Sequence, residues 1–156
     1  MKESILTVLM YIFHQRVDKG APVNLDDMAL IDELKSAGFH AHSIGRAFRW
    51  LHHLTILADQ TLPLSKESFR VYNEQECWLI NTDCRNFITS LEHQGILTPQ
   101  TRELVIHQTL ELINEGVDIN LITWVTLMVL FNTPGCEDAL AQMEILVNSN
   151  AFDTIH

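Results

Sequence analysis

The segment Ile119–Phe131 constrains the fold more than any other stretch, because almost every residue in it is apolar. A helix that is apolar all round is usually the buried centre of a larger protein. The segment is too short to cross a bilayer, which needs about 20 apolar residues. We therefore expect it to form the central helix of a bundle, and no stretch of the chain indicates a membrane span or a cleaved leader.

The first sixty residues show the spacing of apolar side chains that is typical of helices. This spacing predicts helices over about 3–14, 24–37 and 42–54, with Asn24 capping the second and Gly38 ending it. The alternating residues Phe69–Tyr72 predict a short strand. A single strand is not stable alone, so we expect it to pair with the Thr55–Leu57 region.

Helix start and stop signals divide the rest of the chain into further helices. They are a capping box at Asn73 and Glu76, a capping Thr82, a start at Thr98-Pro99 and a break at Thr133-Pro134-Gly135. The fold is therefore predicted to be mainly α. We expect a helix-turn-helix or winged-helix-like lobe with a short strand pair over 1–72, packed on an acidic helical bundle over 73–156. A single compact domain is the alternative.

The charge is distributed unevenly along the chain. The formal net charge is -10, and a uniformly acidic surface would repel nucleic acid and anionic lipid. Residues 1–60, however, hold six bases and seven acids, whereas 61–156 hold four bases and thirteen acids. Residues Leu34–Ala58 include no acid at all. Such asymmetry indicates a binding surface in the first part of the chain.

The predicted third helix carries the candidate binding residues. At 100° per residue, His42, Arg46, Arg49 and His53 share a narrow sector opposite the apolar residues. A helix, a turn at glycine and a second amphipathic helix also form the outline of a DNA-binding helix-turn-helix. Three interpretations stay open: docking of a protein partner, binding of nucleic acid, and a purely structural face that pairs with acidic helices.

Of the two binding functions, docking of a protein partner is favoured over binding of nucleic acid. Leu34 occupies a position where a helix-turn-helix usually has a small residue, and Glu33 one where an apolar residue is expected. The predicted wing offers only Lys66 and Arg70 against two acids, so binding to DNA would gain little from counterion release. We expect a non-enzymatic adaptor, with a winged-helix-like nucleic-acid binder as the alternative.

The residues that could carry chemistry do not form a recognisable constellation. The three cysteines are too few for a disulfide framework and predict thiols in a reducing cytoplasm. On one straight helix Cys77 and Cys84 would lie about 10.5 Å apart, too far for one zinc ion. Cys136 would lie at a helix start that lowers a thiol pKa, but Glu137 beside it opposes this. We expect no metal, no cofactor and no catalytic residue.

Three stretches of the chain resemble the bacterial Smg family. They are Val8–Phe13 (VLMYIF), Arg70–Cys77 (RVYNEQEC) and, most specifically, Trp124–Glu137 (WVTLMVLFNTPGCE). The resemblance covers nearly the whole chain. It implies no activity, cofactor or catalytic residue, because none is assigned in the family. Members are often encoded near a protein that handles incoming DNA, which implies a link to DNA processing by association.

Overall fold

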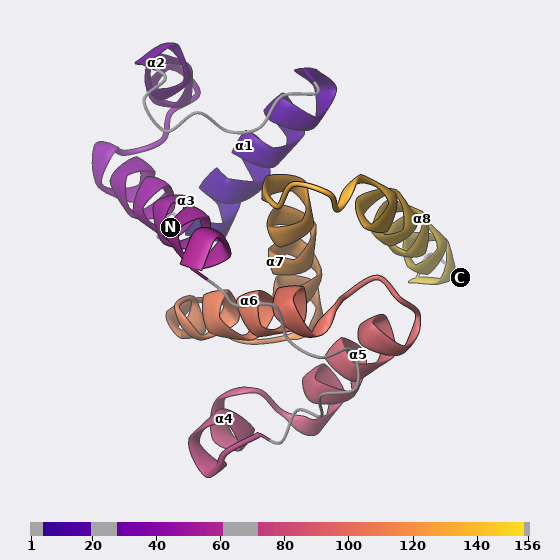
Figure 1. Ribbon diagram of the computed structural model, residues 1–156. Coiled ribbons are helices and arrows are strands. Elements are labelled where there is room, and N and C mark those ends of the chain that lie inside the picture. The colour runs from indigo at the N-terminus through magenta and orange to yellow at the C-terminus, as the bar shows by residue number, and fades with distance from the viewer. Residues whose placement is uncertain (1–4, 20–27, 61–71, 155–156) are drawn as a thin grey trace. The chain divides into compact units, whose positions relative to one another are not determined.

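A computed structural model describes residues 5–19, 28–60 and 72–154 of the chain. These residues form eight α-helices and one short 3-10 helix, with no strand among them (Figure 1). The prediction of a mainly α fold is therefore confirmed. The chain divides into two compact units, Met1–Asp59 and Gln60–His156, which we call the N-terminal and C-terminal units. The predicted pair of domains, 1–72 and 73–156, stays a prediction.

The N-terminal unit contains the three helices that the apolar spacing predicts. They are α1 (Ile5–Lys19), α2 (Met28–Ser36) and α3 (Ala41–Gln60), which ends at the boundary between the units. The predicted cap Asn24 lies outside the described residues. Each helix buries the face that its apolar residues share: Val8, Leu9 and Ile12 on α1, Leu30 and Leu34 on α2, and Ile44, Ala47, Trp50, Leu51 and Leu54 on α3.

The prediction of a strand pair is wrong for Thr55–Leu57, the segment expected to pair with Phe69–Tyr72. Thr55–Leu57 lies inside α3, where the Thr55 hydroxyl donates a hydrogen bond to the Leu51 carbonyl over 3.1 Å. The helix continues there because Leu51 and Leu54 extend its apolar face and residues 51–60 include no proline or glycine. Residues 69–71 of the predicted strand lie outside the described part, and Tyr72 precedes α4 without joining a strand.

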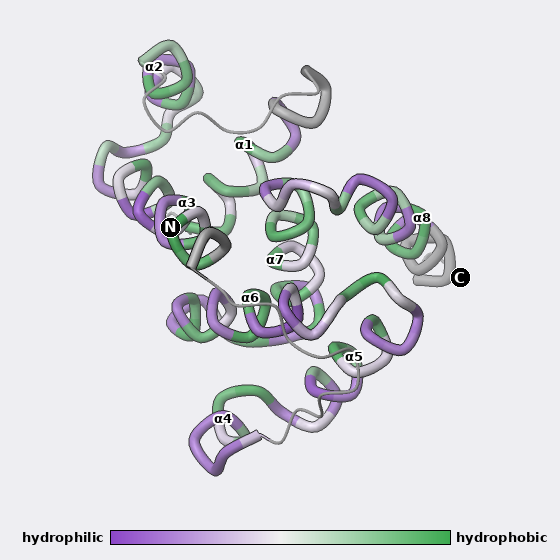
Figure 2. Tube along the Cα trace, in the orientation of Figure 1, coloured by the Kyte–Doolittle hydropathy of each residue, from purple (hydrophilic) through white to green (hydrophobic). Residues whose placement is uncertain are grey.

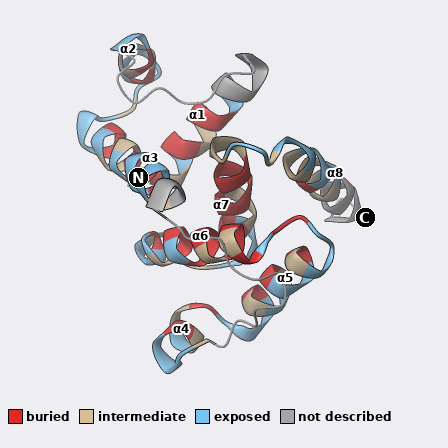
Figure 3. Cartoon of the chain, viewed as in Figure 1, coloured by how far each residue is buried: buried red, intermediate tan, exposed pale blue. Residues whose placement is uncertain are grey.

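The C-terminal unit is built around α7 (Ile119–Asn132). The other elements are α4 (Glu74–Leu79), α5 (Thr82–His93), α6 (Pro99–Leu110), the 3-10 helix η1 (Ile113–Glu115) and α8 (Glu137–Thr154). α7 packs against α5, α6 and α8. Figure 2 shows its largely hydrophobic residues and Figure 3 its largely buried surface. The prediction of a buried central helix is therefore confirmed.

Side-chain caps fix where the helices of this unit begin. Asn73 and Glu76 form the predicted capping box, with hydrogen bonds of 2.8 and 3.0 Å. Thr98 caps α6 ahead of Pro99, also as predicted. α5 differs, because Asn81 rather than Thr82 is its N-cap and accepts from the Cys84 amide over 2.9 Å. The predicted start is wrong by one residue, since both side chains are good caps.

Candidate functional site

The predicted binding residues all lie on α3, outside its buried face. His42, Arg49 and His53 are exposed and Arg46 is half-buried. The buried side comprises Ile44, Ala47, Trp50, Leu51 and Leu54. The structure therefore presents these four side chains on one surface of a single helix, which we call the basic face (His42, Arg46, Arg49 and His53). Its role in binding stays a prediction.

A glycine turn sets where α3 begins. Gly38 has a φ of 100°, a conformation that side chains other than glycine rarely adopt. Its amide donates to the Lys35 carbonyl over 3.1 Å, and the Phe39 amide donates to the Leu34 carbonyl over 3.1 Å. This pair of bonds is a Schellman motif, which closes α2 and directs the chain into α3. The Phe39 ring then packs edge-on against Tyr11 of α1, with centroids 5.4 Å apart.

The two arginines of the basic face have no acidic partner among the described residues. Neither Arg46 nor Arg49 forms an ion pair with another described side chain. The reason lies partly in the sequence, because Leu34–Ala58 holds no Asp or Glu. A surface guanidinium presents planar donors that suit a carboxylate or phosphate. The basic face is therefore able to accept an anionic group from another molecule.

Two of the three cysteine thiols have a raised pKa, which disfavours the thiolate form. Burial raises the pKa of the Cys84 thiol, and the negative charges of Asp118 and Asp83 raise it further. Burial also raises the pKa of the Cys136 thiol, and Glu137 adds to the effect. Cys136 therefore lacks the lowered pKa that a helix start could give a nucleophilic thiol.

Cys77 and Cys84 differ in their burial and contacts. Cys84 is buried, but Cys77 is only half-buried, and its sulfur accepts a hydrogen bond from the Arg85 guanidinium over 3.2 Å. Across the described ranges, no three His, Cys, Asp or Glu side chains are grouped so that they could hold a metal ion. None of the described helices is both long and apolar enough to cross a membrane.

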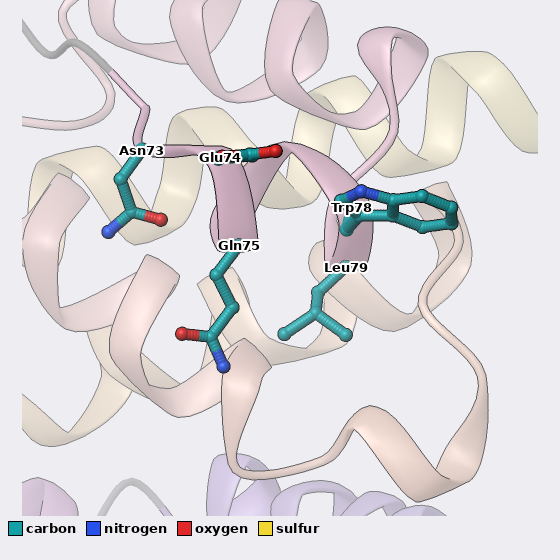
Figure 4. A pocket seen from close by; sticks show the side chains of 5 residues that line it. All are labelled: Asn73, Glu74, Gln75, Trp78 and Leu79. Carbon is teal, nitrogen blue, oxygen red and sulfur yellow. The ribbon is translucent and has the colours of Figure 1, made fainter.

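A pocket on α4 is a feature that sequence reasoning missed. It is lined by Asn73, Glu74, Gln75, Trp78 and Leu79. Figure 4 shows Glu74 and Trp78 along one edge of the helix and Gln75 and Leu79 along another. The Trp78 side chain is 83% exposed, which is unusual for the largest apolar residue type. The polar run Asn73–Glu76 shortly before Trp78 is the signal in the sequence that agrees with this exposure.

The described residues define a helical protein with an exposed basic helix face and an exposed tryptophan pocket. The family model described as "Protein of unknown function (DUF494)" matches residues 5–156. Curated relatives match over the same length. A "Protein Smg homolog" of Coxiella burnetii (strain Dugway 5J108-111) is 46% identical over 155 residues, covering 99% of this chain and 98% of the relative. The chain belongs to the bacterial Smg family.

Two further relatives extend the family match. A "Protein Smg homolog" of Nitrosococcus oceani is 39% identical over 159 residues, and the match covers 100% of this chain and 100% of the relative. "Protein Smg" of Sodalis glossinidius (strain morsitans) is 40% identical over 154 residues, which cover 96% of this chain and 98% of the relative. No solved structure matches the chain. The resemblance found in the sequence motifs is thus confirmed, and the family carries no assigned function.

Proposed function

We propose that the protein is a non-enzymatic adaptor that binds an acidic protein partner through the basic face of α3. The observation that carries the proposal is the pair of arginines, Arg46 and Arg49, which reach the surface without an acidic partner among the described side chains. Complementary charge across an interface directs encounter and selects partners. An acidic protein surface supplies the carboxylates that these guanidinium groups would bind.

The histidines of the basic face widen the surface available to such a partner. His42 and His53 lie on the same side of α3 as the arginines and are exposed. Together the four residues span three turns of helix, from residue 42 to residue 53. Arginine is enriched among the residues that contribute most to binding at protein interfaces. We therefore expect Arg46 and Arg49 to contribute most of the affinity and the histidines to contribute less.

The test is capture of partners from native cytosol, with and without nuclease, followed by reconstitution with the purified partner. Arg46→Ala combined with Arg49→Ala should weaken the reconstituted complex at least tenfold, as expected for hot-spot arginines. Lys35→Ala removes an exposed cation from α2 and is the matched control. Circular dichroism should report an unchanged fold, because neither arginine lies on the buried face. Equal affinity of the double variant would contradict the proposal.

Binding of nucleic acid is the second candidate function. The observation that favours it is the order of α2, the Gly38 turn and α3, which places the basic face on the second helix of a helix-turn-helix outline. A fluorescence anisotropy titration of labelled duplex DNA at low salt tests it. Saturable binding that weakens as salt rises, and that is lost in the double arginine variant, would favour this function over protein docking.

A further inference from the structure

The pocket on α4 combines an aromatic surface with a carboxylate that has no partner in the described part of the chain. Trp78 presents its indole to solvent, and Leu79 supplies an apolar lining beside it. Glu74 is exposed, and no described cation forms an ion pair with it. Glu74 and Trp78 are four residues apart on one helix, which places the two side chains as neighbours on its surface.

The other polar groups of the pocket differ in what they can offer a ligand. The Asn73 side-chain oxygen is occupied, because it accepts the Glu76 amide over 2.8 Å as part of the capping box. Gln75 is exposed, and its amide oxygen can accept a further hydrogen bond. No positively charged side chain lines the pocket. The lining therefore provides an aromatic face, a negative charge and a hydrogen-bond acceptor.

A cation with several N–H donors fits this lining best. Cations are attracted to the face of an aromatic ring, and tryptophan gives the strongest attraction of the aromatic side chains. A guanidinium group is planar, so it can stack on an indole while it donates two hydrogen bonds to a carboxylate. An ammonium group is a more strongly hydrated point charge and gains less from stacking. The chemistry of the pocket thus favours arginine over lysine.

The C-terminal unit already contains one arginine held in this way. The Arg85 guanidinium lies over the Tyr72 ring, 5.9 Å from its centroid, and donates to the Thr82 hydroxyl over 2.9 Å. The Cys77 sulfur accepts from the same guanidinium over 3.2 Å, so an aromatic face and nearby hydrogen-bond acceptors together hold it. The pocket of Trp78 offers the same two elements and adds the carboxylate of Glu74.

We propose that the α4 pocket is a second docking site, which binds an arginine side chain of a partner protein between Trp78 and Glu74. The site is independent of the basic face of α3, since it has the opposite charge and lies on a different helix. The negative charge of the C-terminal half favours a basic partner, because 61–156 hold thirteen acids and only four bases. The partner at this site is thus a basic protein segment.

The test is an NMR titration of the full-length protein with acetylated tetra-arginine amide. The indole N–H resonance of Trp78 is the readout and is assigned by its loss in Trp78→Phe. We expect a saturable shift of this resonance. Trp78→Ala, followed through neighbouring backbone resonances, should weaken binding about 2- to 30-fold by removing the cation–π contact. Glu74→Gln should weaken it about two- to fivefold, as for an exposed ion pair.

Two comparisons separate this site from general attraction to an acidic protein. Asp138→Asn removes an exposed acid of α8 outside the pocket and should leave the affinity unchanged. Tetra-citrulline has the same shape without the charge and should not bind. Equal affinity of Trp78→Ala and the unchanged protein would overturn the proposal, as would equal loss in Asp138→Asn and Glu74→Gln. Equal affinity for tetra-lysine would overturn the assignment of arginine.

Discussion

Arg102 of α6 is buried and forms an ion pair with the half-buried Glu92 of α5. The Nη1 atom of Arg102 lies 3.1 Å from Oε1 and 3.0 Å from Oε2 of Glu92, and Arg102 is only 3% exposed. The Nε atom of the same side chain donates to Glu103 over 2.9 Å. A buried charge is stable only when it is paired and hydrogen-bonded. These contacts satisfy that condition for Arg102.

Removing the guanidinium should therefore destabilise the protein. Arg102→Met keeps much of the apolar stem but leaves Glu92 and Glu103 without this donor. We expect a loss of about 1.5–3 kcal/mol in the free energy of unfolding, typical of hydrogen bonds to charged groups. Urea denaturation followed by circular dichroism measures it. Arg49→Met, on an exposed arginine without an ion pair in the described part, is the control and should change stability by less than about 0.5 kcal/mol.

The cap of α5 gives a second prediction. Asn81→Ala removes the acceptor of the Cys84 amide and should lower the free energy of unfolding by about 1 kcal/mol. Thr82→Ala is the comparison, because Thr82 is the first helical residue and its hydroxyl accepts an exposed hydrogen bond from Arg85 Nη2. Thermal or urea denaturation of the two variants measures the difference. A larger loss in Thr82→Ala would contradict the assignment of Asn81 as the cap.

The third prediction concerns the burial of α7. Ile122 is fully buried, whereas Ile119 on the same helix is 43% exposed. Ile122→Ala should cost about 2–5 kcal/mol because it leaves a cavity among packed helices. Ile119→Ala makes the same chemical change near the surface and should cost less than half as much. Chemical denaturation of both variants measures the ratio, and similar losses would show that α7 is not buried as described.

The thiols give a prediction that depends on pH. The pKa values of Cys84 and Cys136 are raised above 9.0, first by burial and then by nearby acids. The thiolate is the reactive form, so alkylation of both thiols should be slow at pH 7 and should rise only at pH values above 9. Mass spectrometry after timed treatment with iodoacetamide measures each rate. Rapid labelling of Cys136 at pH 7 would instead support a nucleophilic role.

The raised pKa of Cys84 also determines how the stability of the protein changes with pH. The folded protein keeps the Cys84 proton at pH values where the unfolded chain, with a pKa near 9.0, releases it. The stability that this thiol contributes is thus complete below about pH 9 and is lost as the pH rises toward the folded pKa. Cys84→Ala should lose less stability between pH 8 and 10 than the unchanged protein, as measured by urea denaturation.

Local signals in the sequence predicted most of the helices. The Asn73–Glu76 box and the Thr98-Pro99 start depend only on residues within one turn, so they could be identified without a structure. The apolar run of α7 is similarly self-contained, because burial on all sides leaves no polar face. The prediction of a strand at Thr55–Leu57 was wrong. It was made only to provide a partner for Phe69–Tyr72, whereas the residues themselves continue the helical spacing of α3.

The candidate sites were only partly predictable. The basic face of α3 follows from helical periodicity, so its four residues could be placed together from the sequence. The exposure of Trp78 and the burial of Arg102 depend on which helices pack nearby, and both run against the usual preference of their residue type. Such contacts between distant segments leave no periodic pattern in the sequence, so the α4 pocket emerged only from the structure.

The packing of α7 against α5, α6 and α8 has a consequence for hydrogen exchange. A helix enclosed by three others cannot expose its amides while those neighbours stay folded. The amide protons of its buried residues Val125–Leu130 should therefore exchange with deuterium only through opening of the C-terminal unit as a whole. The slowest-exchanging amides of this unit would then lie in α7, and their protection would report the global stability of the unit.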